Sequence, residues 1–143
     1  MTHDRYRLIE QLKRHEGFRD MPYRDTVGKL TIGYGHNLDD VPISQKVAEL
    51  MLLEDLEREE KKLAKAVPWF NKVPPGARRE ALVNMAFNLG ARGLSKFRRM
   101  WSAINRNDWD LAAKEALDSK WATQVGRRAD ELAEQLRTGL YRT

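Results

Sequence analysis

The chain has 143 residues, with 26 Lys and Arg against 21 Asp and Glu, a net charge of +5, no cysteine and three histidines. A chain of this length buries roughly two-thirds of the surface that its unfolded form exposes, so packing alone can stabilise it. The absence of cysteine excludes a disulfide scaffold, a cysteine zinc site and a thiol nucleophile. No apolar run approaches the roughly 20 residues of a membrane span, and the first residues lack the apolar core of a signal peptide. We therefore expect a soluble chain made in the cytoplasm, without membrane insertion.

The positive charge is unevenly distributed along the chain. Residues 1–72 hold 13 basic and 13 acidic side chains, whereas residues 73–143 hold 13 basic and 8 acidic ones. A basic half suggests a polyanionic partner, which is nucleic acid, an anionic membrane face or a bacterial envelope. Composition leaves these three partners open.

The first segment predicts a helix. Apolar residues recur at helical spacing over residues 4–16, where Asp4 can cap the start and Gly17 can end the helix. This makes Glu16 the last helical residue.

Residues 18–38 predict a small antiparallel hairpin, because they form short, partly alternating stretches separated by glycine. On its second strand Leu30 and Ile32 face one side. Thr31 therefore faces the other side.

The rest of the chain predicts helices. Ser44 can cap a long helix that runs to about residue 65, and prolines then break the chain between residues 67 and 76. Further helices are expected over residues 78–89, 94–104 and 108–118 and after Gly126. The predicted class is α+β, with one helix, a small sheet, a long connecting helix and a helical lobe.

Common cofactor and metal motifs are not matched. The Gly33-Tyr34-Gly35 sequence lacks the third glycine of a dinucleotide fingerprint. The three histidines are scattered, and the sequence has no phosphate loop or nucleophile elbow. We expect no cofactor and no metal.

Nucleic-acid binding is a weaker alternative. Three arginine doublets lie on predicted helices with tryptophans among them: Arg78-Arg79, Arg98-Arg99 and Arg127-Arg128. Solvated helix faces explain these doublets without any partner. We therefore expect no nucleic-acid partner.

Two carboxylates lie in unlike predicted environments. Glu16 is at a helix C-terminus, where the helix dipole favours the protonated form of a carboxyl group. Asp25 lies at a hairpin turn, where a polar environment keeps it ionised. One protonated and one ionised carboxyl group are the requirement for glycoside hydrolysis, and Thr31 could hold the water. Their spacing alone leaves a non-catalytic interpretation open, in which Glu16 is a solvated helix end and Asp25 only stabilises its own turn.

A longer pattern adds to this hypothesis. The chain contains His15-Glu16-Gly17, Tyr23-Arg24-Asp25-Thr26-Val27-Gly28 and Thr31-Ile32-Gly33-Tyr34-Gly35-His36. These motifs resemble the phage-type lysozymes of glycoside hydrolase family 24, with Glu, Asp and Thr at the family's spacing. Residues 84–90 look like the family's central buried helix, and Trp109-Asp110, Lys120-Trp121 and Arg127-Arg128-Ala129 look like its C-terminal signature. The resemblance covers essentially the whole chain.

The resemblance implies a role for each matching residue. Glu16 is then the proton donor, Asp25 directs the water and Thr31 is its partner across the cleft. Arg128 would pair with Glu16, and His36 with Asp55 in a structural role. The implied substrate contacts are Asn37, Phe87, Asn88, Met100 and Glu115.

The resemblance also implies a fold and an activity. We expect a single lysozyme domain over residues 1–143, with a sheet lobe at about 18–42, a connecting helix at about 44–65 and a helical lobe at about 75–143 that includes helix 4–16. We expect an endolysin that cuts the β-1,4 bond between N-acetylmuramic acid and N-acetylglucosamine in bacterial peptidoglycan, with inversion. A monomer would then act in the periplasm, on the host cell wall, after release from the host cytoplasm. The alternatives are a lytic transglycosylase and a non-catalytic glycan-binding domain.

Overall fold

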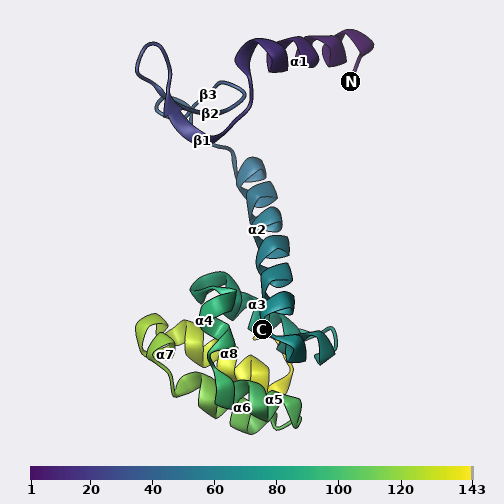
Figure 1. Ribbon diagram of the computed structural model, residues 1–143, viewed down its shortest axis with the longest axis vertical. Coiled ribbons are helices and arrows are strands. Elements are labelled where there is room, and N and C mark those ends of the chain that lie inside the picture. The colour runs from purple at the N-terminus through teal and green to yellow at the C-terminus, as the bar shows by residue number, and fades with distance from the viewer. Residues whose placement is uncertain (143) are drawn as a thin grey trace. The chain divides into compact units, whose positions relative to one another are not determined.

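The computed structural model describes residues 1–142, which fall into two units, Met1–Leu50 and the residues from Met51 onward. The first unit contains α1 (His3–Glu16), β1 (Arg19–Arg24), β2 (Leu30–Gly33), β3 (His36–Asn37) and the start of α2 (Gln45–Ala66). The second contains the rest of α2, η1 (Pro68–Lys72), α3 (Ala77–Leu89), α4 (Ala91–Ser95), α5 (Arg98–Asn105), α6 (Trp109–Leu117), α7 (Lys120–Val125) and α8 (Arg127–Thr138). Figure 1 shows the sheet in the first unit and the helices α3–α8 gathered in the second. The predicted α+β class is confirmed. The expected membership of residues 4–16 in the helical lobe concerns the placement of the two units and stays a prediction.

Helix α1 ends where the sequence predicts, but its cap is Thr2, two residues before the predicted cap Asp4. The Thr2 side chain accepts a hydrogen bond from the Arg5 backbone N–H at 3.1 Å, whereas Asp4 lies in the first turn. The prediction of Asp4 as the cap is therefore wrong, because the hydroxyl of Thr2 already satisfies the free N–H group. At the other end, Gly17 has φ of 70° and follows Glu16, as predicted.

The sheet has one strand more than the predicted hairpin. Its three strands are antiparallel in the order β1-β2-β3. Thr31 is the central residue, paired with Tyr23 on β1 and with Asn37 on β3. Thr31 is only 3% exposed, so the side of β2 opposite Leu30 and Ile32 is the more buried one.

Helix α2 begins at its predicted cap. The Ser44 hydroxyl accepts a hydrogen bond from the Val47 backbone N–H at 3.2 Å, and the helix runs to Ala66. Leu63, near its end, is fully buried in the core of the second unit. Pro68 then starts the short 3-10 helix η1.

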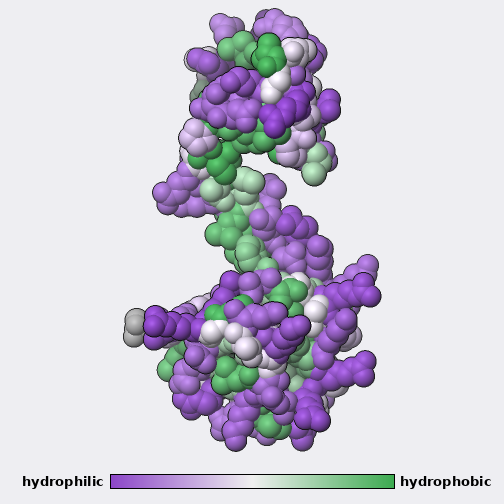
Figure 2. All heavy atoms as spheres, turned by 90° about the vertical axis from the view of Figure 1, so that its left-hand side faces the viewer, coloured by the Kyte–Doolittle hydropathy of each residue, from purple (hydrophilic) through white to green (hydrophobic). Residues whose placement is uncertain are grey.

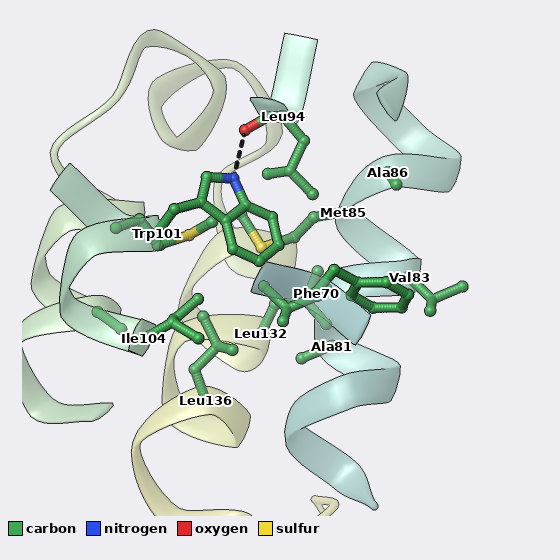
Figure 3. Close-up of a cluster of buried hydrophobic side chains, with 14 of the residues drawn as sticks. Phe70, Ala81, Val83, Met85, Ala86, Leu94, Trp101, Ile104, Leu132 and Leu136 are labelled. Atoms are coloured by element: carbon green, nitrogen blue, oxygen red, sulfur yellow. Dashed lines mark hydrogen bonds between the residues drawn. The ribbon is translucent and has the colours of Figure 1, made fainter. Parts of the chain in front are cut away.

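Helix α8 organises the second unit, because it packs against α3, α6 and α7, while α5 packs against α6 and η1. The apolar side chains between these helices form a continuous buried core, part of which Figure 3 shows. Trp101 lies within this core and donates its indole N–H to the Leu94 carbonyl oxygen at 2.9 Å. This bond satisfies the one polar group of the buried ring.

The prediction of one helix over residues 94–104 is wrong, because the chain breaks between α4 and α5. The backbone N–H groups of Lys96 and Phe97 bond to carbonyl groups three residues earlier, which closes tight turns and ends α4. Phe97 has ψ of 62°, outside the helical range, and its ring packs edge-on against Trp121 at 6.4 Å between centroids.

Helix α7 was not expected from the sequence. The Ser119 hydroxyl caps it by accepting from the Ala122 backbone N–H at 3.1 Å, and it donates to the Ala116 carbonyl oxygen at 2.8 Å. The caps of the neighbouring helices do follow the sequence: Asp108 caps α6 and Gly126 precedes α8.

The surface of the second unit is mainly hydrophilic on the face shown in Figure 2, where charged and polar side chains surround smaller apolar areas. None of the helices described over residues 1–142 combines the length and the apolar character needed to cross a bilayer.

We expect Phe70→Ala to lower the free energy of unfolding by about 3–5 kcal/mol, because it removes a large side chain from a packed core. Phe70 is fully buried, and the guanidinium of Arg79 lies 4.0 Å from its ring centroid. Urea unfolding followed by circular dichroism measures the change. The matched control is Trp69→Ala, since Trp69 is the neighbouring aromatic residue of η1 and is 37% exposed. An equal loss in both variants would contradict the packing described here.

Candidate active site

The Glu16 carboxyl group lies directly against the backbone of Gly35. A Cβ atom built on Gly35 would approach Glu16 Oε2 to 2.6 Å, which is closer than atoms can pack. Gly35 also has φ of +73°, a conformation that side chains with a Cβ atom rarely adopt. Glycine at position 35 therefore makes room for the carboxyl group at the turn between β2 and β3.

Asp25 is held by its own turn between β1 and β2. Its Oδ1 atom accepts the backbone N–H groups of Val27 at 3.0 Å and Lys29 at 2.8 Å. Its own N–H donates to the Lys29 carbonyl oxygen at 2.9 Å. Within residues 1–142, no hydrogen bond engages the second carboxyl oxygen, Oδ2, so this atom is available to a ligand.

Thr31 is also tied to the main chain of Lys29. Its hydroxyl group donates to the Lys29 carbonyl oxygen at 2.9 Å. A hydroxyl group has one hydrogen, so Thr31 Oγ1 can only accept any further hydrogen bond. The structure thus brings Asp25 and Thr31 together on the main chain of Lys29, and each of them offers an acceptor.

Charged side chains surround the turn between β1 and β2. The hydrogen bond between Lys29 Nζ and Asp40 raises the pKa of Lys29 and lowers the pKa of Asp40, which also accepts from the Asn37 amide. Asp39 accepts the Leu30 backbone N–H at 2.8 Å. Asn37 is doubly engaged, because its oxygen accepts the Asp40 backbone N–H at 3.1 Å. Its expected contact with a substrate stays a prediction.

The expected pair of His36 and Asp55 joins residues of different units and stays a prediction. The Nε2 atom of His36 lies 3.0 Å from the Val41 carbonyl oxygen. Asp55 accepts from Arg58 at 2.6 Å, and this bond raises the pKa of Arg58.

Phe87 and Asn88 occupy the last turn of α3, and both are exposed. Asn88 accepts the indole N–H of Trp121 at 2.7 Å. Arg128 bonds within the second unit to the Asn84 side-chain oxygen, at 2.7 and 3.2 Å. Its expected pairing with Glu16 joins the two units and stays a prediction.

The remaining candidates lie around open pockets or in the core. Phe87 and Arg128 line a pocket of about 310 Å³. Glu115 lines another of about 350 Å³, together with the aromatic ring of Phe97 and the basic side chains Lys96, Arg98 and Arg99. Met100 is only 1% exposed and belongs to the core, and its contact with a substrate stays a prediction.

The described part of the chain, residues 1–142, brings together no group of three metal-ligating side chains.

The sequence was then compared with known proteins. Residues 13–138 match the family model described as phage lysozyme, a range that contains every candidate residue named above. The pre-baseplate central spike protein Gp5 of Enterobacteria phage T4 is 31% identical over 160 residues. That alignment covers 92% of this chain, which spans only 28% of the length of the spike protein.

Two further relatives are similar over most of their own length. The probable T4-type lysozyme 2 of Dictyostelium discoideum is 29% identical, over 92% of this chain and 94% of that protein. The endolysin of Acyrthosiphon pisum secondary endosymbiont phage 1 is 31% identical, over 82% of this chain and 80% of that protein.

We expect Gly35→Ala to displace the Glu16 carboxyl group, because the added Cβ atom would overlap it. The matched control is Gly33→Ala, since Gly33 has nearly the same φ, +69°, but open space where its Cβ atom would lie. Both variants should lose about 1–2 kcal/mol of stability from the strained backbone. Crystal structures of the two variants measure the position of Glu16. An unmoved carboxyl group in Gly35→Ala would contradict the close approach.

Proposed function

The chain belongs to the phage lysozyme family of glycoside hydrolases, and on that premise we propose that it hydrolyses the β-1,4 bond between N-acetylmuramic acid and N-acetylglucosamine in bacterial peptidoglycan. The observation that carries this proposal is that Asp25 and Thr31 both bond to the main chain of Lys29, in the same unit as Glu16. The names of the T4-type lysozyme and endolysin relatives support the same activity.

Glu16 is the proton donor in this proposal. Its carboxyl group lies against Gly35 at the end of α1. Glu16 gives its proton to the glycosidic oxygen as the bond from this oxygen to the anomeric carbon breaks. The leaving sugar then departs as a neutral alcohol.

Asp25 and Thr31 direct the attacking water. Both present acceptors, Oδ2 of Asp25 and Oγ1 of Thr31, so a water between them directs one hydrogen at each. The oxygen lone pair of this water is left free to bond the anomeric carbon. Asp25 takes the proton that the water loses, and the products are two neutral sugar chains. Before the next turnover, Asp25 must release this proton and Glu16 must take one up.

A water held in this way attacks from the face opposite the leaving group, which inverts the anomeric centre. Inversion requires the two carboxyl groups to lie roughly 6.5–9.5 Å apart, so that a water fits between the sugar and the base. We propose that the carboxyl groups of Glu16 and Asp25 lie at this distance from each other in the complex with substrate.

Residues of both units bind the glycan in this proposal. Asn37 contributes from the sheet, and Phe87, Asn88, Met100 and Glu115 contribute from the helices. Arg128 pairs with Glu16, and His36 pairs with Asp55 to support the site.

We further propose that the chain is an endolysin that lyses the host cell from the periplasm, a role that the name of the phage relative, endolysin, supports. The net charge of +5 supports attraction to an anionic cell wall. The monomeric state stays a prediction.

We expect Glu16→Gln to lower the lysis of purified peptidoglycan at least 100-fold, because glutamine cannot donate the proton. Dye release from stained peptidoglycan measures the rate. Glu10→Gln is the matched control, since Glu10 lies on the same helix and forms only an exposed ion pair with Lys13. Lysis by Glu16→Gln at the rate of the unchanged chain would contradict the assignment of the proton donor.

We expect the first-formed product to carry the inverted anomeric configuration, because the water rather than Asp25 attacks the sugar. Proton NMR of the reaction at early times measures which anomer appears. A retained anomer would rule out the water-directing role of Asp25, and an anhydro sugar seen by mass spectrometry would indicate a lytic transglycosylase. As the matched variant, Asp25→Asn keeps an oxygen for the turn but loses the base, so it should fold and show little turnover.

A further inference from the structure

Two adjoining pockets of the second unit lie apart from the candidate residues described above. One, of about 210 Å³, lies between η1 with the loop after it and the turn that joins α5 to α6. The other, of about 340 Å³, extends along the start of α3. Both are lined by Val73, Pro74, Asn107 and Trp109, so they form one continuous groove, which we call the tryptophan groove. None of the proposed catalytic or substrate-contact residues lines it.

The tryptophan groove carries two of the four tryptophans of the chain. Trp69 is 37% exposed, and Trp109 is half-buried. The other two, Trp101 and Trp121, lie in the core and donate their indole N–H groups within the protein. Within residues 1–142, the N–H groups of Trp69 and Trp109 donate to no protein atom. Both therefore offer a ring and a hydrogen-bond donor to a ligand.

The ring of Trp109 is supported from behind by an arginine. The guanidinium group of Arg78 lies over the ring, 4.9 Å from its centroid. Arg78 donates from Nε to the Leu136 carbonyl oxygen and from Nη2 to the Arg137 carbonyl oxygen, both at 2.8 Å. These bonds fix the guanidinium group at the end of α8. A ring held in this way loses little conformational freedom when a ligand stacks against it.

Two amide side chains add to the polar lining of the groove. Asn105 and Asn107 are exposed, and within residues 1–142 neither side chain forms a hydrogen bond with the protein. Asn107 has φ of 58°, and its backbone N–H closes the end of α5 by bonding to the Ile104 carbonyl oxygen at 2.9 Å. Glycine would close the same turn. The fold therefore does not need the Asn107 amide, which is available to a ligand.

The charges of the tryptophan groove favour a ligand that is rich in oxygen acceptors and carries little negative charge. No carboxylate side chain of residues 1–142 lines either pocket. The cations that line them are Lys72 and Arg78, and Arg78 is already bound to two carbonyl groups. These charges are too few for a nucleic acid, which binds through many phosphate contacts.

A glycan fits this lining better. The C–H faces of a sugar ring are apolar and stack against aromatic rings, while the hydroxyl and acetamido oxygens accept hydrogen bonds from indole and amide N–H groups. A peptidoglycan strand also carries occasional carboxylates, which Lys72 can pair with. The two tryptophans, the two amides and the single uncommitted cation of the groove match these groups.

We propose that the tryptophan groove is a second glycan-binding site, which binds N-acetylated hexosamine units of a peptidoglycan strand without cleaving them. Trp69 and Trp109 stack against sugar rings, and Asn105 and Asn107 bond to their oxygens. The inference rests on the proposed function for the identity of the glycan. It goes beyond that function, because a second site holds the protein on an insoluble wall and so raises the local concentration of substrate.

The first experiment follows the four indole N–H signals by nitrogen-15 NMR while a peptide-free peptidoglycan hexasaccharide is added to Glu16→Gln, which leaves the sugar intact. We expect the signals of Trp69 and Trp109 to shift with one Kd. The signal of Trp101, which is bonded to Leu94 in the core, should stay in place. A titration that leaves either groove signal in place overturns the inference, and so does an equal shift of Trp101.

Two variants in the same background test the contacts. Trp69→Ala removes the exposed ring, and Asn107→Gly removes the amide but keeps a residue that adopts a positive φ. Each should raise the Kd read from the Trp109 signal roughly 3- to 10-fold. Tyr6→Ala is the matched control, since Tyr6 is an aromatic residue of α1 that is 60% exposed, and it should leave the Kd unchanged. A Kd within twofold of the background in either groove variant overturns the inference.

A kinetic measurement tests the role of the groove on the wall. In Trp69→Ala with Glu16 present, the ratio of the hydrolysis rate on insoluble sacculi to the rate on a soluble tetrasaccharide should fall roughly 3- to 10-fold. The reason is that a tetrasaccharide fills the catalytic site alone and gains nothing from a second site. An unchanged ratio overturns the proposed role.

The remaining outcomes separate this inference from its alternatives. A single-stranded oligonucleotide that shifts the two groove signals when the hexasaccharide does not would assign the groove to nucleic acid and overturn the inference. Hydrolysis by the unchanged chain, lost in Glu16→Gln, shows that the proposed function holds when only the inference fails. If both groove signals shift but the unchanged chain hydrolyses no peptidoglycan, the proposed function fails and the glycan-binding site stands.

Discussion

The main chain of Lys29 is the constraint on which the proposed catalytic geometry depends. Its N–H group binds the Asp25 carboxylate, and its carbonyl group accepts both the Asp25 backbone N–H and the Thr31 hydroxyl. Three hydrogen bonds to the main chain of one residue fix the length of the turn between β1 and β2 and the register of β2. Because side chains alternate along a strand, one residue more or less in this turn would move Thr31 to the opposite face of the sheet.

The second constraint is the space available to the Glu16 carboxyl group. Glu16 ends a helix, and a carboxyl group at this position can enter the sheet region only where the neighbouring backbone carries no side chain. Gly35 supplies that gap at a turn that already requires a positive φ. The same glycine therefore serves both the turn and the close approach. Gly33 serves the backbone alone, since space is open around its Cα atom.

Several features set by neighbouring residues could be predicted from the sequence, although the cap of α1 and the helix α7 could not, whereas features set by distant contacts were missed. Ser44 and Asp108 cap their helices as predicted, because a cap depends on residues three positions away. At the break between α4 and α5, the Phe97 ring packs against Trp121, a contact that no local pattern contains. For the candidate site, the motifs indicated which residues to consider. The sequence did not reveal that Asp25 and Thr31 both bond to the main chain of Lys29 or that Trp121 bonds to Asn88.

The proposed catalytic residues and the proposed binding residues are held by different kinds of interaction. This difference affects which substitutions can alter substrate binding alone. Asp25 and Thr31 are held by main-chain atoms of Lys29, and Glu16 lies against the main chain of Gly35, and substitutions elsewhere leave these atoms in place. Asn88 is held by a side chain 33 positions away, and Arg128 by another 44 positions away. A single substitution at Trp121 or Asn84 can therefore reorient a proposed binding group without altering the backbone that carries the chemistry. The proposed substrate contacts can therefore change in this protein while the proposed catalytic residues stay in place.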